Sequence, residues 1–132
     1  LKLRLREGET IIINGAVLRA ASRTELALEN RAAILRGREV MKPEEAVTPA
    51  SALYFAAMLH YVDNRARDRH EHGLLERLSA VVALSKTARS QALCARFARL
   101  MAQRDHYAAL GTCRQLMALE AAAMAPQQNE AA

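Results

Sequence analysis

Basic side chains alternate with leucines at the start of the chain. The alternating residues are Leu1, Lys2, Leu3, Arg4, Leu5 and Arg6. A two-residue period is typical of a half-buried β-strand, because successive side chains point to opposite faces of the sheet. Every outward position of this strand is positively charged, and an arginine guanidinium can donate two parallel hydrogen bonds to a phosphate group. The pattern therefore predicts a strand with one face on a core and the other face open to a polyanion such as nucleic acid.

The excess of positive charge lies in the first third of the chain. Residues 1–42 contain nine Lys or Arg against five Glu, while the whole chain has 19 basic and 14 acidic residues and a net charge of +5. We expect contacts with RNA from the first strand and from the segment after the last strand. The candidate RNA-binding residues are Lys2, Arg4, Arg6, Arg36, Arg38 and Lys42. The alternative is a solvated edge strand whose charges prevent aggregation.

The sequence offers little for catalysis or for metal binding. Residues 1–42 lack aromatic side chains, which argues against a base-stacking sheet. His70 and His72 are two residues apart on an expected helix, so they point in different directions and cannot share an ion as an i, i+4 pair can. Glu44 and Glu45 are adjacent carboxylates, but acids before a helix are ordinary partners of its dipole. With no nucleophile elbow or phosphate-binding glycine loop, we expect no enzyme activity, no metal and no cofactor.

The cysteines and the apolar segments indicate a cytoplasmic protein. Cys94 and Cys113 form no C-x-x-C pair and fit as small buried residues in a reducing cytosol. No apolar run is long enough to cross a bilayer, and no signal peptide is visible. We therefore expect no membrane partner.

Residues 1–45 predict a module of about five short antiparallel strands arranged as a meander. The strands are expected at about 1–6, 10–13, 16–20, 24–28 and 32–35. Asn14-Gly15 is a strong hairpin signal, because a type I′ turn needs positive φ at both central residues. A sheet this small must dock on helices, pair with a second copy through its edge strands, or both. A homodimer is therefore one of the expected assemblies.

Residues 46–125 predict a bundle of about four α-helices, so the fold class is α+β. The helices are expected at about 50–62, 65–84, 86–103 and from after Asp105 to about 124, with residues 126–132 as a disordered tail. Thr48, Ser85 and Asp105 are the expected N-cap residues, and Pro49 suits the first helical position. The apolar positions repeat at helical spacing, so one stripe of each helix is expected to face a common core.

Several segments, taken in order along residues 1–120, resemble one known family. These segments are 3–8, 9–17, 26–30, 33–35, 43–46, 48–50, 54–56, 107–110 and 113–116. They are similar to those of the flagellar biosynthesis regulators of the FlbT type. The resemblance implies a cytoplasmic regulator that binds the 5′ untranslated region of flagellin messenger RNA and represses its translation when flagellar assembly is incomplete. Some relatives act positively, so the direction of regulation stays open.

The β module has a second resemblance. Gly8-Glu9-Thr10 followed by an apolar strand is similar to the start of the CsrA family of small RNA-binding translational regulators. In that family five short strands pair between two chains, and RNA lies against the first and last strands. The corresponding basic positions here would be Arg4, Arg6, Arg36 and Arg38. This chain departs from the pattern in its alternating arginines and its long helical half.

The helical half suggests an alternative function. Arg96 and Arg99 are expected on the face opposite Leu100, and methionines supply adaptable apolar surface. The methionines in question are Met58, Met101, Met117 and Met124. Helical hairpins of this kind commonly present a groove to a partner helix, although core packing explains each methionine equally well. The alternative is a protein-binding adaptor or chaperone-like regulator whose partner is flagellin or another flagellar regulatory protein.

Overall fold

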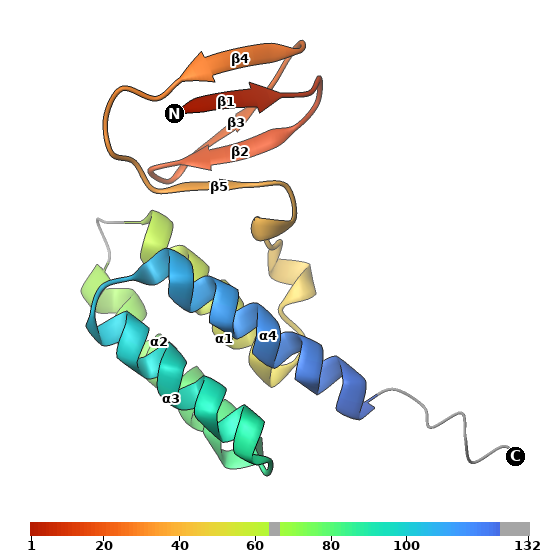
Figure 1. The fold of residues 1–132 in the computed structure, drawn as a ribbon, viewed down its shortest axis with the longest axis vertical. Helices are drawn as coiled ribbons and strands as arrows, with labels where there is room; N and C mark the ends of the chain where they lie inside the picture. The colour runs from red at the N-terminus through yellow and green to blue at the C-terminus, as the bar shows by residue number, and fades with distance from the viewer. Residues whose placement is uncertain (64–66, 125–132) are drawn as a thin grey trace, which may run out of the picture.

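The protein has five short strands at one end and four helices at the other, which confirms the α+β class (Figure 1). The structure is a computed structural model and describes residues 1–63 and 67–124. The strands are β1 (Lys2–Leu5), β2 (Thr10–Ile13), β3 (Ala16–Arg19), β4 (Thr24–Ala27) and β5 (Ile34–Arg36). Two single-turn 3-10 helices follow, η1 (Gly37–Glu39) and η2 (Pro43–Glu45). The α-helices are α1 (Pro49–Val62), α2 (Arg67–Leu84), α3 (Ala88–Ala102) and α4 (His106–Met124).

The strands form two antiparallel sheets, so the predicted meander is wrong. β1 pairs with β4, and β2 lies between β3 and β5 in the second sheet. The connection after β1 crosses beside the end of β3, where Gly8 N–H donates to Ala20 O at 2.7 Å and Ala20 N–H donates to Glu9 O at 2.9 Å. β1 therefore lies outside the sheet of β2 and pairs with β4.

β2 explains why two sheets are needed. Its neighbouring residues Ile11 and Ile12 are both buried although they point to opposite faces. Ile11 packs with Leu3 and Leu5 in a small core between the two sheets. Ile12 packs with Leu35 in the larger core that the helices share. The three-stranded sheet thus lies between the β1–β4 sheet and the helices, with β5 nearest the bundle in Figure 1.

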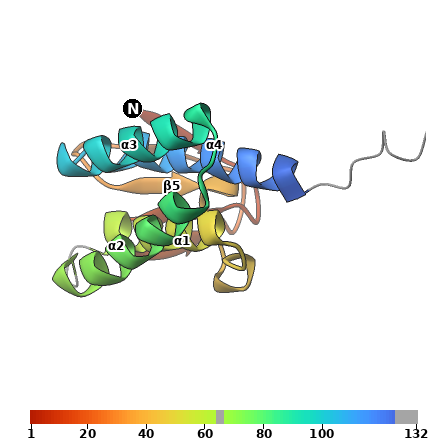
Figure 2. The ribbon, with the colours of Figure 1, turned by 90° about the horizontal axis from the view of Figure 1, so that it is seen from below.

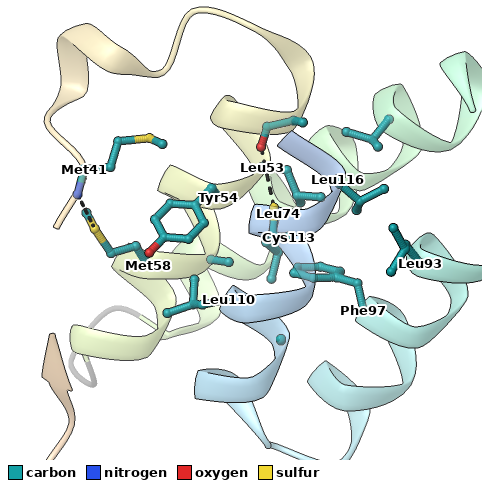
Figure 3. Close-up of a cluster of buried hydrophobic side chains, with 14 of the residues drawn as sticks. Met41, Leu53, Tyr54, Met58, Leu74, Leu93, Phe97, Leu110, Cys113 and Leu116 are labelled. Carbon is teal, nitrogen blue, oxygen red and sulfur yellow. Dashed lines mark hydrogen bonds between the residues drawn. The ribbon is translucent and has the colours of Figure 1, made fainter. Parts of the chain in front are cut away.

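The larger core crosses the boundary predicted at residue 45. Figure 3 shows Tyr54, Leu110 and Phe97 converging with Cys113 from three different helices, and Met41 reaches the same cluster from the segment before α1. In Figure 2, α1 and α2 form one layer, and α3 and α4 form another. The division into domains at 1–45 and 46–125 stays a prediction.

The alternation in β1 is confirmed except at its first residue. Leu3 and Leu5 are buried, and the basic residues between them are exposed. Leu1 is exposed, contrary to the prediction, because β1 begins at Lys2 and Leu1 lies beyond the edge of the small core. β1 therefore has the expected cationic outer face.

Two of the three predicted N-caps are confirmed. Ser51 N–H donates to Thr48 Oγ1 at 3.2 Å, and Ala108 N–H donates to Asp105 Oδ1 at 3.4 Å. The cap of α3 is Thr87 and not Ser85. Ser85 Oγ instead donates to the Val81 carbonyl at 2.8 Å, four residues back, and so closes the end of α2. The predicted tail at 126–132 lies outside the described residues.

The Asn14-Gly15 turn is confirmed and also touches the helical half. Both residues have positive φ, 50° at Asn14 and 85° at Gly15. Asn14 Oδ1 accepts a hydrogen bond from Ala33 N–H at 2.8 Å, which ties the turn to the start of β5. A Cβ at Gly15 would lie 2.8 Å from the backbone oxygen of Val62, the last residue of α1. The turn thus needs glycine for its conformation and for close packing on α1.

We expect Gly15→Ala to lower the free energy of unfolding by about 1–3 kcal/mol. The added Cβ is strained at positive φ and also meets the Val62 backbone. Gly8→Ala is the matched control, because Gly8 has a similar φ of 82° but nothing within 4 Å of its ideal Cβ. Urea unfolding of both variants measures the difference. Equal losses at the two positions would show that the contact between the turn and α1 contributes nothing.

Two further expectations concern the membrane and metal ions. No helix in the described parts of the chain is long and apolar enough to span a membrane. Among the side chains that the structure describes, those of residues 1–63 and 73–124, there is no group of three His, Cys, Asp or Glu placed to hold a metal ion. The side chains of His70 and His72 lie outside the described residues, so the absence of a metal site stays a prediction.

Candidate nucleic-acid interface

An open groove of about 1020 Å³ lies where the two sheets meet the β1–β2 and β3–β4 connections. Charged side chains line it. They are four arginines, Arg4, Arg6, Arg23 and Arg36, and three glutamates, Glu7, Glu9 and Glu25. The groove therefore brings together three of the six predicted RNA-binding residues, Arg4, Arg6 and Arg36. The exposure and the ion pairs of each arginine decide which of them can bind a ligand.

Arg4 and Lys2 stand on the outer face of β1 and share one carboxylate. Glu25 lies opposite Arg4 on β4, with Arg4 Nε 3.5 Å from Glu25 Oε2 and Lys2 Nζ 3.8 Å from Glu25 Oε1. All three side chains are largely exposed. Exposed ion pairs contribute only about 0–1 kcal/mol and are screened by salt. Both cations can therefore exchange this carboxylate for a phosphate group at little cost.

Arg36 is held much more firmly. Its Nη2 lies 2.9 Å from Glu9 Oε2, its Nε donates to the same oxygen at 3.0 Å, and the guanidinium also donates to the Arg4 carbonyl. The hydrogen bond from Arg6 N–H lowers the pKa of the Glu9 carboxyl, and the Arg36 guanidinium lowers it further, while burial acts in the opposite direction. Arg36 thus connects β5 to the loop between β1 and β2, and most of its hydrogen-bonding capacity is already used.

Arg6 and Arg23 are the cations of the groove that form no ion pair with a carboxylate of residues 1–63 or 73–124. Both side chains are exposed, and the charge of Arg6 acts on Glu9 only as a small contribution that lowers the pKa of that carboxyl. Arg6 follows β1, and Arg23 lies just before β4. Arg23 was not among the predicted RNA-binding residues. Arg23 lies in the connection between β3 and β4, and the predicted meander gives no reason to expect that connection beside β1.

Arg38 and Lys42 do not line the groove. Arg38 belongs to η1 and Lys42 precedes η2, and both are exposed on the segment that leaves β5 for the helices. Neither forms an ion pair with a carboxylate in the described part of the chain. They add positive charge after Gly37, which does line the groove, so their contact with RNA stays a prediction.

Glu39 connects the end of β5 to the helical half. Its Oε1 accepts a hydrogen bond from Arg36 N–H at 3.1 Å, and its Oε2 accepts one from the Tyr107 hydroxyl and lies 4.0 Å from Arg114 Nη1. Its backbone oxygen accepts a hydrogen bond from the buried Tyr54 hydroxyl at 2.8 Å. The hydrogen bond to Glu39 raises the pKa of Tyr107. Nothing in the sequence singled out this glutamate, because its partners come from α1 and α4.

We expect the free energy of unfolding to fall as the pH rises above about 9. Burial raises the pKa of Cys113 from 9.0 to about 12 and that of Tyr54 from 10.0 to about 12. The unfolded chain releases these protons at lower pH than the folded protein does, so alkaline solution favours unfolding. The stabilisation is complete below pH 9 and is lost as the pH approaches 12.

Urea unfolding between pH 7 and pH 11 measures this loss, and Tyr54→Phe should flatten the part of the curve above pH 10. A free energy that stays constant to pH 11 would contradict the burial of both groups.

A second groove, of about 440 Å³, is apolar and lies at the other end of the bundle. It is formed where α1 and α3 begin and α2 and α4 end. Leu84 and Met124, which are both exposed, line it together with Leu119. Among the methionines proposed as partner surface, Met58 is buried in the core, while Met101 and Met117 are partly buried against it. Met124 is thus the methionine that reaches this groove.

Comparison with known proteins gives a consistent family. Residues 1–124 match the family described as "Flagellar protein FlbT". A "Probable flagellum biosynthesis repressor protein FlbT" from Caulobacter sp. (strain K31) is 33% identical over 121 residues, which cover 91% of this chain and 92% of that protein. The "Flagellum biosynthesis repressor protein FlbT" of Caulobacter vibrioides (strain ATCC 19089 / CIP 103742 / CB 15) is 31% identical over 121 residues, covering 91% and 86%.

The relatives from Brucella match a shorter part of the chain. A "Probable flagellum biosynthesis repressor protein FlbT" from Brucella abortus (strain S19) is 39% identical over 88 residues, which cover 67% of this chain and 58% of that protein. No solved structure matches the chain.

Proposed function

This chain belongs to the FlbT family of flagellar proteins, and we propose that it regulates flagellin expression by binding the 5′ untranslated region of flagellin messenger RNA and repressing its translation. Its Caulobacter relatives carry the name flagellum biosynthesis repressor, which supports a regulatory role in flagellum biosynthesis. The groove of about 1020 Å³ with its four arginines is the observation that supports RNA as the ligand.

The groove suits a single-stranded or looped RNA. Arg6 and Arg23 are free to donate to phosphate oxygens, and Arg4 with Lys2 can exchange Glu25 for the RNA backbone. Arginine forks also stack on and hydrogen-bond to unpaired bases, which is how proteins read RNA loops. The three glutamates repel phosphate, so the backbone would follow the arginines around them.

Repression then needs no covalent step. A protein that occupies the leader blocks access of the ribosome to the start of the message. A message that is not translated is also degraded sooner, and both effects lower the amount of flagellin made. Repression of this kind takes place in the cytoplasm, where the message is translated. Lys2, Arg38 and Lys42 extend the cationic surface beyond the groove.

The experiment that tests RNA binding uses the purified full chain and a labelled flagellin leader. Fluorescence anisotropy at 50 to 300 mM salt should show binding whose log affinity falls linearly with log salt, with a slope of about −0.7 for each phosphate neutralised. A scrambled RNA of the same length should bind with the same slope but more weakly. Absence of binding to the leader at 50 mM salt would exclude direct RNA binding.

A protein-binding role for the helical half is the second candidate. The apolar groove at the open end of the bundle is the observation that favours it, because exposed Leu84 and Met124 lie on its rim. The partner in this account is flagellin or another flagellar regulatory protein, and the effect on the message is indirect. Leu84→Glu should abolish capture of that partner by the full chain while leaving binding of the leader unchanged. Capture of purified flagellin that is unaffected by Leu84→Glu would exclude this groove as its site.

A further inference from the structure

Strand β3 is exposed on both of its faces. Val17 lies opposite Ile12 and Leu18 lies opposite Ile11, so each pair shares a face of the sheet. The two isoleucines are buried, but Val17 is 68% exposed and Leu18 is 46% exposed. β3 therefore extends beyond both cores, with apolar side chains in water on each side.

The outer edge of β3 also has unpaired backbone groups. The two-residue hairpin pairs Ile13 with Ala16, so Ala16 and Leu18 exchange hydrogen bonds with β2. The N–H and C=O groups of Val17 and Arg19 then point away from β2. Within the described residues β3 has no other partner strand, because it is the end strand of its sheet.

β3 lacks the charges that protect the other free edges. β1 carries Lys2 and Arg4, and β4 carries Glu25, so a second copy placed along the β1–β4 sheet would meet charged side chains. β3 has one charge, Arg19, at its end, and it contains neither proline nor a bulge. Natural proteins use charge, proline and bulges to prevent pairing at sheet edges. An edge without them is suited to form a strand pair.

We propose that a second copy of this chain pairs antiparallel along β3, which joins the two three-stranded sheets into one continuous sheet. Outward-pointing residues must face each other across the new ladder, so Val17 can lie opposite Val17 or opposite Arg19 of the second copy. The Val17–Val17 register is favoured by charge. It places Arg19 opposite Gly15 and keeps the two guanidinium groups at opposite ends of the ladder, whereas the other register makes them diagonal neighbours.

The favoured register also covers apolar surface on both faces. The two Val17 side chains meet on one face, and Leu18 meets Ala16 of the second copy on the other. Val17, the more exposed of the two large apolar residues of β3, thereby becomes the centre of the interface. This dimer is independent of RNA binding, since β3 does not line the arginine groove.

Sedimentation equilibrium of the full chain tests the dimer. We expect a dimer whose dissociation constant rises at least tenfold in Val17→Lys and in Val17→Pro. The proline removes the outward N–H of residue 17 but no hydrogen bond between β3 and β2. It therefore weakens pairing with the second copy without removing a bond within the folded chain. Val47→Lys is the matched control, because Val47 is 80% exposed and lies outside the strands. A chain that is monomeric at all concentrations, or a dimer that both Val17 variants leave intact, would overturn the proposal.

Disulfide formation tests the register. Hydrogen-bonded antiparallel pairs have Cα atoms about 5.5 Å apart, which suits a disulfide. Val17→Cys should therefore form an interchain disulfide under mild oxidation, and Ala16→Cys should form much less. The native Cys94 and Cys113 are both buried, so the unsubstituted chain provides the blank. Cross-linking that is equal at the two positions would contradict the Val17–Val17 register.

Discussion

Replacing Arg6 and Arg23 together by alanine is expected to weaken binding of the flagellin leader by about 10- to 100-fold, or roughly 1.4–2.8 kcal/mol. These two guanidinium groups line the groove and form no ion pair with any carboxylate that the structure describes. Both are exposed, so the folded structure does not depend on them. The loss of two phosphate contacts should also reduce the salt slope by about 1.4.

The control for this result removes the same charge elsewhere. Arg96 and Arg99 are exposed on α3, and Arg96→Ala with Arg99→Ala lowers the net charge by the same amount. Anisotropy should show little change in leader affinity for this variant. Equal weakening in the two double variants would mean that overall charge, and not the groove, attracts RNA.

Leu35→Ala is expected to lower the free energy of unfolding by about 2–5 kcal/mol. Leu35 lies on β5, is 0% exposed and packs in the core that the helices share. Because this core joins the strands to the bundle, the loss should appear in a single transition that strands and helices follow together. Urea unfolding monitored by circular dichroism and tyrosine fluorescence follows the helices, where all three tyrosines lie, and amide hydrogen exchange of residues 1–45 follows the strands.

Leu26→Ala is the matched control for that variant. Leu26 lies on β4, is 37% exposed and should lose less than about 1 kcal/mol. If Leu35→Ala unfolds the strands first and leaves the helical transition at its original urea concentration, the two halves are independent domains.

Local signals in the sequence predicted the individual elements well. Alternation around Arg4, the Asn14-Gly15 turn and the Thr48-Pro49 cap depend on residues within a few positions of one another, and the structure has each of them. Period and capping chemistry act over one turn or one strand, so they can be read without knowing the rest of the fold. The order of the elements followed from the same signals.

Strand pairing and the state of each arginine could not be read in this way. Glu9 and Arg36 are 27 residues apart, and Glu39 and Tyr107 are 68 apart. Which glutamate neutralises which arginine depends on the two-sheet arrangement, and that arrangement follows from the need to cover both faces of β2. The sequence therefore indicated a cationic module without showing which of its arginines are held by a carboxylate.

Cell-free translation of a reporter carrying the flagellin leader tests the central claim most directly. The full chain should reduce translation from this leader and not from an unrelated leader, and the Arg96/Arg99 double variant should reduce it equally. The Arg6/Arg23 double variant should lose most of the effect. Translation that the full chain leaves unchanged, or repression that survives loss of both groove arginines, would contradict the account.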